Sequence, residues 1–205
     1  MSSDTEVTTE TKPAETKPAE TKPAAKPAAK PAAKPAAKPA ELPAFEKSIS
    51  DKIVEKFGDK IEVEFVKENR VGIKVNRDDI HDVAEFIRDG LNYDHVESVS
   101  GVDYPQDKEI EVVYHIGSYS DSSLAKQLLV LATRAQREEN PIPGKDATKL
   151  PTLRDIFYSV EFHEREVFEM FGVYFTGHPD NRRLLLPEDW ADLPPLRKDF
   201  AIKGR

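Results

Sequence analysis

Acidic residues and histidines gather between positions 161 and 180, so this stretch is the first candidate for a catalytic or metal site. His163 and Glu164 begin the His-Glu-x-x-His pattern of zinc proteases, but valine occupies position 167, where the second histidine belongs. His178 lies near Glu169 and Asp180 in the sequence. A single histidine among carboxylates is typical of a hydrogen-bonded structural group, and we predict no metal ligands.

Acid–base chemistry is the other possibility for these carboxylates. Glu164 and Glu166 are two residues apart, and such neighbours on a helix do not face each other. No nucleophile or oxyanion donor accompanies them, so we predict no catalytic residues. A glycine-rich phosphate loop is also missing from the sequence, which argues against a bound nucleotide and predicts no cofactor on this chain. We interpret His81, His95 and His115, which are isolated in the sequence, as ordinary surface or core residues.

A helix over residues 161–171 is expected to carry the acidic residues. Its apolar positions fall on one side, and Gly172 is well placed to end it. The polar side is formed by Glu164, Arg165, Glu166 and Glu169. Arg165 and Glu169 form an i,i+4 pair, and the simplest interpretation of four such charges is a solvated helix face.

The residues after this helix change in character. Residues 173–175 are typical of a short strand, and 177–180 have the composition of a turn. The leucine run 184–186 and the prolines that follow cannot form a core by themselves, and they exclude a regular helix or central strand. Because tryptophan, arginine and phenylalanine are enriched at interfaces, we predict an extended docking arm.

The order and spacing of these residues resemble the signature of the C-type (30 kDa-type) subunit in the respiratory complex I family, the proton-pumping NADH:quinone oxidoreductases. That signature has Glu-Arg-Glu, two residues, an acid and two apolar residues, then a histidine, a basic residue and an apolar pair at fixed spacing. The matching positions are Glu164, Arg165, Glu166, Glu169, Met170, Phe171, His178, Arg182, Leu184 and Leu185. Phe162 stands where the family usually has tryptophan.

The resemblance implies a peripheral, cofactor-free structural subunit that is not catalytic in isolation. Such a subunit packs against the D-type subunit in the hydrophilic arm, beside the small subunit that holds the last iron–sulfur cluster before quinone. The complex would use flavin, iron–sulfur clusters and quinone, and this chain would lie on the cytoplasmic face of a bacterial or archaeal cell membrane. The signature and interface positions are Glu164, Arg165, Glu166, Glu169, Gly172, Gly177, His178, Pro179, Arg182, Arg183, Trp190, Arg197 and Asp199.

By the same resemblance, the four charged helix residues would fix the helix and pair with the partner. Residues 177–183 would set the turn from which the arm leaves, while Trp190, Arg197 and Asp199 would anchor it. Two relatives remain open as alternatives: an archaeal dehydrogenase of reduced deazaflavin (F420H2) that reduces methanophenazine or quinone, and a membrane-bound hydrogenase. An alternative from another class is an acidic adaptor unrelated to respiration.

Composition narrows the function classes further. The chain has 205 residues and no cysteine, which excludes disulfides, a catalytic thiol and thiolate-bound zinc, and argues against an iron–sulfur cluster on this chain. A net charge of −8 argues against general nucleic-acid binding. No apolar run is long enough for a transmembrane helix, so membrane association is expected only through partners.

The chain divides into three expected parts. Residues 1–43 repeat Lys-Pro-Ala units and hold half of the 16 prolines, which predicts a disordered, polyproline-biased tail. Residues 44–175 alternate helix and strand patterns, as in an α+β domain with a mostly antiparallel sheet. Residues 176–205 form the extended C-terminal arm.

Local patterns predict elements within the domain. Helices are expected over 45–57, from a cap at Asn76 to Gly90, and over 151–157. Strands are expected over 61–75 as a hairpin, and over 95–104 and 109–118. Periodicity favours a helix over 124–135, but the family resemblance implies a strand there, and we adopt the strand.

Overall fold

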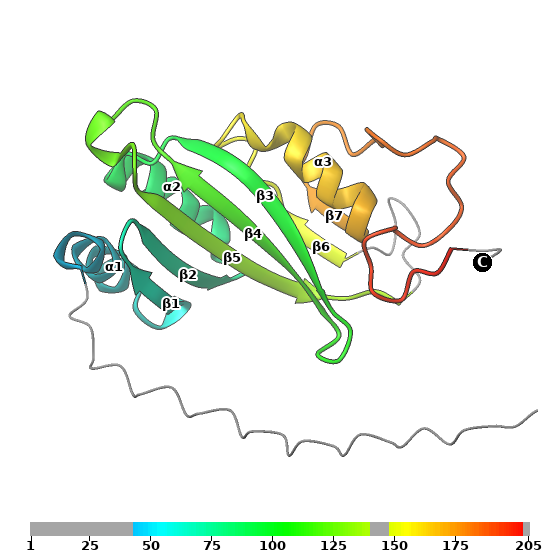
Figure 1. Ribbon diagram of the computed structural model, residues 1–205, viewed down its shortest axis with the longest axis horizontal. Coiled ribbons are helices and arrows are strands. Elements are labelled where there is room, and N and C mark those ends of the chain that lie inside the picture. The colour runs from blue at the N-terminus through cyan, green and yellow to red at the C-terminus, as the bar shows by residue number, and fades with distance from the viewer. Residues whose placement is uncertain (1–42, 140–147, 203–205) are drawn as a thin grey trace, which may run out of the picture. The chain divides into compact units, whose positions relative to one another are not determined.

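The computed structural model describes residues 43–139 and 148–202 (Figure 1). The tail predicted at 1–43 lies, except for Pro43, outside the described residues. The α-helices are α1 (Ala44–Phe57), α2 (Ile80–Leu91) and α3 (Val160–Phe171). The strands are β1 (Ile61–Lys67), β2 (Arg70–Asn76), β3 (His95–Tyr104), β4 (Glu109–Gly117), β5 (Leu128–Gln136), β6 (Thr148–Pro151) and β7 (Val173–Thr176).

Five strands form the main sheet, in the order β1-β2-β5-β4-β3. All neighbouring pairs are antiparallel except β2 and β5, which run parallel. The predicted α+β fold with a mostly antiparallel sheet is therefore confirmed. Strand β3 is at one edge of this sheet and β1 is at the other.

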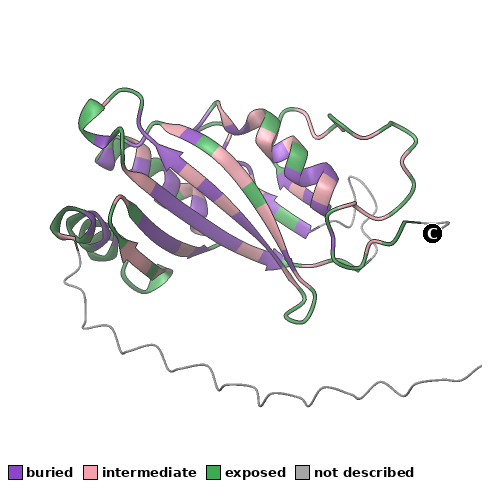
Figure 2. Ribbon diagram, in the orientation of Figure 1, coloured by how far each residue is buried: buried purple, intermediate pink, exposed green. Residues whose placement is uncertain are grey.

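The hydrophobic core lies on one face of the sheet. Alternate residues of the central strands are buried there because successive side chains of a strand point to opposite faces. In Figure 1 the helices α2 and α3 lie on the same side of the sheet, and Figure 2 shows how much of the central strands is buried. The buried strand residues of this face include Val71, Ile73, Leu129, Leu131, Ile110, Val112 and Tyr114.

Helix α3 connects the two strands of a second, smaller sheet. Strands β6 and β7 pair in parallel, with Leu150 opposite Phe175. The N–H of Thr152 donates to the carbonyl of Thr176 at 3.0 Å and extends this pairing by one residue. The start of the C-terminal arm is thereby fixed to the segment that precedes α3.

Most element predictions are confirmed, but the boundaries of α2 are different. Asn76 was predicted to cap the helix; it is the last residue of β2, and its carbonyl accepts a turn hydrogen bond from the N–H of Asp79. The helix also continues past Gly90 to Leu91, and Asn92 ends it with a left-handed φ of 61°. Asparagine tolerates this conformation, so the glycine was not needed as the cap.

The strand expected from the resemblance at 124–135 is confirmed as β5, although it begins only at Leu128 and follows a short 3-10 helix at Ser122–Leu124. The helix favoured by periodicity is wrong. Strand β5 lies between β2 and β4, with its side chains largely buried. A strand buried on both faces is a continuous apolar run, which local periodicity cannot distinguish from a buried helix.

The short helix predicted over 151–157 is also wrong. Pro151 belongs to β6, and the following residues form a single turn in which the N–H of Phe157 donates to the carbonyl of Leu153. The N–H of Leu153 instead binds the Glu164 carboxyl group, a long-range partner that no local pattern shows. None of the described helices is long and apolar enough to cross a membrane.

Candidate functional site

Glu164 lies completely buried on the inner side of α3, where it binds two other segments. The Tyr114 hydroxyl of β4 donates to its Oε1 at 3.1 Å, and the N–H of Leu153 donates to the same oxygen at 2.9 Å. The Thr152 hydroxyl donates to Oε2 at 2.5 Å. This one carboxyl group therefore connects α3 to the centre of the sheet and to the end of β6.

Burial controls the electrostatics at this point. It raises the pKa of Glu164 to about 7, although the hydrogen bonds from Leu153, Thr152 and Tyr114 oppose the shift. Burial likewise places the pKa of Tyr114 well above its ordinary value, so this hydroxyl remains a donor. A carboxyl group with such a pKa can exchange a proton near neutral pH, but it has no exposed surface through which to contact a substrate.

His178 forms the first turn of the arm and is also buried. Its Nδ1 accepts from the N–H of Asp180 at 3.0 Å, and its Nε2 lies 3.1 Å from the carbonyl oxygen of Glu161. A carbonyl can only accept, so Nε2 carries the proton and the ring is the neutral Nε2–H tautomer. Nε2 also lies 3.9 Å from Glu164 Oε2. The prediction that His178 is hydrogen-bonded within the chain is confirmed.

The residues on either side of His178 shape the same turn. Gly177 has a φ of 87°, which favours glycine, and a Cβ there would lie 3.4 Å from the Thr152 side chain. Pro179 is exposed and follows His178 directly. The turn therefore needs both a residue that tolerates positive φ and a buried imidazole.

Glu169, five residues along α3 from Glu164, is the second buried carboxylate. Its Oε2 accepts from the N–H groups of Leu184, Leu185 and Leu186 at 3.0 Å each, and its Oε1 accepts from Leu185 at 2.9 Å. Three successive backbone donors form a concave nest around one anion. Glu169 thus fixes the backbone of the arm.

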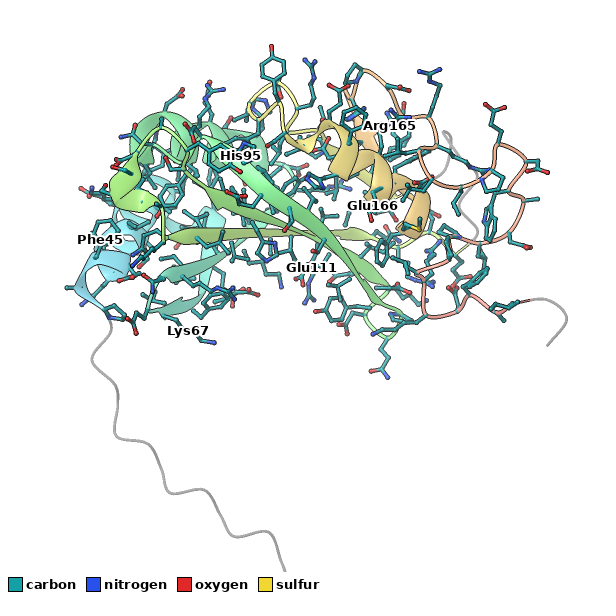
Figure 3. The ribbon with its side chains drawn as sticks, turned by 45° about the horizontal axis from the view of Figure 1, so that its top comes forward. Phe45, Lys67, His95, Glu111, Arg165 and Glu166 are labelled. Atoms are coloured by element: carbon teal, nitrogen blue, oxygen red, sulfur yellow. The ribbon has the colours of Figure 1, made fainter. Side chains whose placement is uncertain are left out.

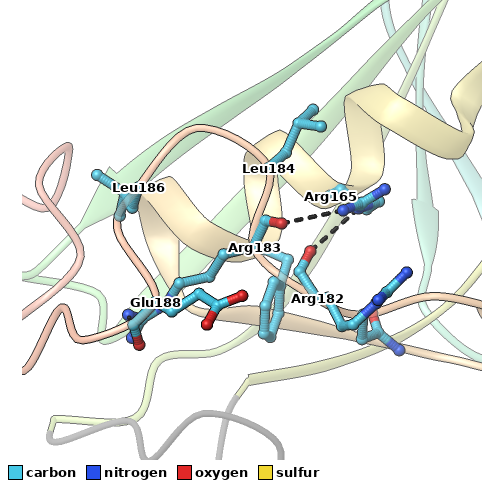
Figure 4. A pocket seen from close by; sticks show the side chains of 8 residues that line it. Arg165, Arg182, Arg183, Leu184, Leu186 and Glu188 are labelled. Atoms are coloured by element: carbon cyan, nitrogen blue, oxygen red, sulfur yellow. Dashed lines mark hydrogen bonds between the residues drawn. The ribbon is translucent and has the colours of Figure 1, made fainter.

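Arg165 binds the residues of the arm that directly precede this nest (Figure 4). Its Nε donates to the carbonyl of Arg182 and its Nη2 to the carbonyl of Arg183, both at 3.0 Å. Its Nη1 lies 3.3 Å from Asp180 Oδ2. A side-chain hydrogen bond from Arg182, together with the charges of both arginines, lowers the pKa of Asp180 below its ordinary value.

Arg183 arranges the next part of the arm. Its Nη1 donates to the carbonyls of Pro187 and Glu188 at 2.8 and 3.0 Å, and its Nη2 donates to the carbonyl of Trp190 at 2.6 Å. The Trp190 ring lies 6.0 Å from the ring of Phe200. By contrast, the Arg182 side chain is 84 % exposed and forms a two-point pair with Asp180.

A third polar cluster holds the end of the arm against the tips of β3 and β5. Asp103 accepts from Arg137 Nε at 2.7 Å and from the N–H of Lys198 at 2.8 Å. Arg137 Nη2 also pairs with Asp199 at 2.7 Å. Burial disfavours the charged form of Asp103, but these partners outweigh it and lower its pKa. Buried Arg197 donates to the carbonyl of Glu138, and burial lowers the pKa of Arg197.

The solvated helix face predicted for α3 is wrong. Glu164 and Glu169 are buried, and the expected pair of Arg165 with Glu169 is replaced by contacts of both residues with the arm. Gly172 ends the helix as predicted, with a φ of 79°. Of the four charged positions, Glu166 alone remains exposed, at the edge of a cavity described below.

Sequence reasoning missed the residues that receive these contacts. Asp103, Arg137, Tyr114 and Thr152 belong to strands and to a loop far from the signature in sequence. Their local context is that of ordinary strand or turn residues. Only their long-range pairing reveals their role, so no motif could have found them.

The surface around the signature is apolar in part. Phe162 is 59 % exposed and Leu185 is 61 % exposed, while Leu184 is exposed to a lesser degree. A cavity of about 780 Å³ opens beside them between α3 and the arm, and its lining combines Phe168, Leu184 and Leu186 with arginine side chains. Exposed apolar side chains next to a rigid polar framework are typical of an interaction surface.

Among residues 43–139 and 148–202, no group of three or more histidine, aspartate or glutamate side chains is placed to hold a metal ion. The two buried carboxylates of α3 are enclosed by hydrogen-bond donors of the same chain. What this arrangement can do is hold the arm in one shape and present its outer surface.

Comparison with known proteins shows the family of this chain. The family described as "Respiratory-chain NADH dehydrogenase, 30 Kd subunit" matches residues 73–205, more than half of the chain. The chain is 36 % identical over 131 residues to the C-type subunit of the F(420)H(2) dehydrogenase of Methanosarcina mazei, covering 64 % of this chain and 75 % of the relative. It is 35 % identical over 156 residues to the C-type subunit of the NADH-quinone oxidoreductase of Chlorobium phaeobacteroides, covering 75 % and 87 %.

A solved structure agrees with the sequence relatives. A chain of the membrane-bound sulfane sulfur reductase, an archaeal respiratory membrane complex, superimposes with a TM-score of 0.59 and 29 % identity over 77 % of this chain and 86 % of that chain. The signature helix, its turn and the arm lie within the matched family region. The chain therefore belongs to the family of the 30 kDa subunit of respiratory-chain NADH dehydrogenase.

Proposed function

We propose that this chain is the C-type subunit of a membrane-associated respiratory oxidoreductase, in which it binds neighbouring subunits through α3 and the arm. The observation that carries this proposal is the exposure of Phe162, Leu184 and Leu185 beside a helix whose Glu164, Arg165 and Glu169 side chains are bound within the chain. A structural subunit needs a rigid surface with apolar anchors, and an active site needs reactive groups that are accessible.

The partners that fit best are the D-type subunit and the small subunit that holds the last iron–sulfur cluster before the acceptor. Flavin and the clusters would belong to other subunits, since this chain contains no cysteine to bind a cluster. Contact with these partners would place the chain on the cytoplasmic face of the cell membrane. Electron transfer and proton translocation would be properties of the complex, and the isolated chain would have no activity.

Two electron donors are supported by the relatives. The name of the Chlorobium protein gives NADH as donor and quinone as acceptor, and the name of the Methanosarcina protein gives reduced F420 as donor. The two proteins have nearly the same sequence identity to this chain. We propose the NADH:quinone enzyme first and an F420H2 dehydrogenase as the alternative. The sulfane sulfur reductase adds a third class of complex in which this fold occurs.

Purification from native membranes tests the proposal. The tagged full-length chain is extracted in a gentle detergent, its partners are identified by mass spectrometry, and the eluate is assayed with NADH and with reduced F420. We expect cluster-bearing subunits and NADH oxidation with a quinone acceptor. Oxidation of F420H2 alone would select the alternative, and recovery of the chain alone from the soluble fraction would contradict both.

A further inference from the structure

A small groove runs between α3 and the edge strand β3. It has a volume of about 240 Å³. Its apolar lining consists of Val99 and Gly101 from β3, Val167, Met170 and Phe171 from α3, and Leu196 from the arm. In the described part of the chain, β3 pairs only with β4, so the outer edge of β3 beside the groove has no strand partner.

The groove owes its shape to two local contacts. A Cβ at Gly101 would lie 2.5 Å from the Phe171 ring, so only glycine lets α3 pack directly on β3 at this point. The N–H of Leu196 donates to the carbonyl of Met170 at 3.1 Å and holds the arm at the mouth of the groove. The Leu196 side chain is nevertheless 56 % exposed.

Glu166 lies at the rim of this groove and differs from the other charged residues of the signature helix. Figure 3 shows Glu166 and Arg165 as neighbours on α3. Arg165 and Glu169 bind the arm, and Glu164 binds the sheet. Among the described residues, Glu166 is exposed and has no hydrogen-bond or ion-pair partner, so its carboxylate is available to another chain.

We propose that this groove receives a segment of a neighbouring subunit that carries a lysine or arginine beside an apolar side chain. The apolar side chain enters between Val99, Met170 and Leu196, and the cation pairs with Glu166. Charge complementarity supports this occupant, because Glu166 has no partner among the described residues and lies at an apolar rim, and the whole chain has a net charge of −8. The inference rests on the proposed function and specifies the chemistry of one contact.

The absence of cysteine makes this contact accessible to cross-linking. Glu166→Cys in the full chain is labelled with a thiol-specific photo-cross-linker, incorporated into the complex in native membranes and irradiated. Glu55→Cys, at another exposed glutamate, on α1, serves as the matched control. We expect position 166 to capture one neighbouring subunit, at a peptide that contains lysine or arginine, and position 55 not to capture that peptide.

Charge reversal gives the second measurement. Glu166→Lys is expected to lower the recovery of the chain in the complex about tenfold, which corresponds to ~1.4 kcal/mol, while Glu55→Lys leaves it unchanged. The melting temperature of the isolated Glu166→Lys chain should equal that of the wild type, because the side chain is exposed. Changing the captured lysine or arginine to glutamate should restore assembly with Glu166→Lys.

Three results would overturn the inference. Normal assembly of Glu166→Lys would show that the ion pair does not form. Capture of a second copy of this chain would show that the chain forms a homodimer at this groove. Capture of no protein would show that the groove is empty in the complex. In each of these cases a wild-type chain that still co-purifies with cluster-bearing subunits keeps the proposed function intact. A wild-type chain recovered alone would contradict both.

Discussion

The two buried glutamates of α3 bind different kinds of partner. Glu164 accepts from two hydroxyl groups and one N–H that belong to the sheet and to the end of β6. Glu169 accepts only from backbone N–H groups of the arm. The first carboxyl group therefore stabilises the core of the domain, and the second holds the backbone of a surface segment in its conformation. Two residues of one motif serve fold stability and surface geometry separately.

The largest expected loss of stability follows from replacing Glu164, the carboxyl group in the core. Glu164→Ala leaves the Leu153 N–H and two buried hydroxyl groups without an acceptor, and it opens a cavity. We expect the free energy of unfolding to fall by about 3–4 kcal/mol, measured by urea denaturation at pH 6. Glu161→Ala, which breaks the part-exposed pair with Arg154, should cost less than about 1 kcal/mol. Equal losses in the two variants would remove the distinction between core and surface carboxylates.

The pH dependence of stability tests the same carboxyl group. Its pKa is about 7 in the folded chain and 4.5 is its ordinary value, so the folded state binds more protons than the unfolded state between these values. Stability from this group is therefore fully present below pH 4.5 and is lost as pH rises toward 7, by roughly 2–3 kcal/mol. Asp103 has the opposite dependence. Because its pKa is lowered in the folded state, its contribution to stability is present above pH 3.8 and is lost as the pH falls below that value.

Glu164→Gln isolates this contribution. Glutamine resembles the protonated carboxyl group, so the variant should show a flat stability profile where the wild type declines between pH 4.5 and 7. Urea denaturation at closely spaced pH values measures both profiles. A decline that persists unchanged in the variant would assign it to another group.

For the glutamate that binds the arm, Glu169→Gln is expected to loosen the arm and leave the domain folded. One amide oxygen replaces a carboxylate that accepts four hydrogen bonds, a loss of about 1–2 kcal/mol. Limited proteolysis should cut faster within 181–190, while the far-UV circular dichroism remains that of the wild type. Glu166→Gln on the same helix is the control and should change neither. Unfolding of the whole domain in Glu169→Gln would show that arm and core are one cooperative unit.

The smallest effects are expected at the two arginines of the arm. Arg183→Lys loses the planar fork that contacts three carbonyl oxygens, and should weaken the arm by about 1 kcal/mol. Arg182→Lys should leave the melting temperature and the proteolysis rate unchanged, because that side chain is 84 % exposed. Both are measured by proteolysis of the arm. Identical rates for the two variants would contradict the assignment of the anchoring role to Arg183.

The sequence permitted prediction of the fold class and of most elements, because strand alternation and helix-ending glycines are local features. It also placed the charged residues of the signature from Glu164 to Glu169 on one helix that ends at Gly172. Burial of Glu164 and Glu169 could not be predicted, since their partners Tyr114, Thr152 and the leucine backbone lie far away in sequence. Helix periodicity assigned both to a polar face, and it is silent about which polar side chains find donors in the interior.

The contacts that anchor the arm could not be predicted either, because they also depend on partners far away in sequence. Trp190, Arg197 and Asp199 were predicted as anchors from the family resemblance, and their role in assembly stays a proposal. The structure adds Asp103 and Arg137, which meet Lys198 and Asp199 only because β3 and β5 end at the same side of the sheet. A residue whose partner depends on sheet order carries no recognisable pattern of its own.

The position of Trp190 has a spectroscopic consequence. It is the only tryptophan of the chain, and it lies in the arm beside Phe200 with its indole N–H donating to the carbonyl of Leu193. Intrinsic fluorescence excited at the indole band therefore reports the arm and not the sheet. Binding of a neighbouring subunit over the arm should shift this emission to shorter wavelength as water is excluded from the ring, so the chain contains its own optical probe of assembly.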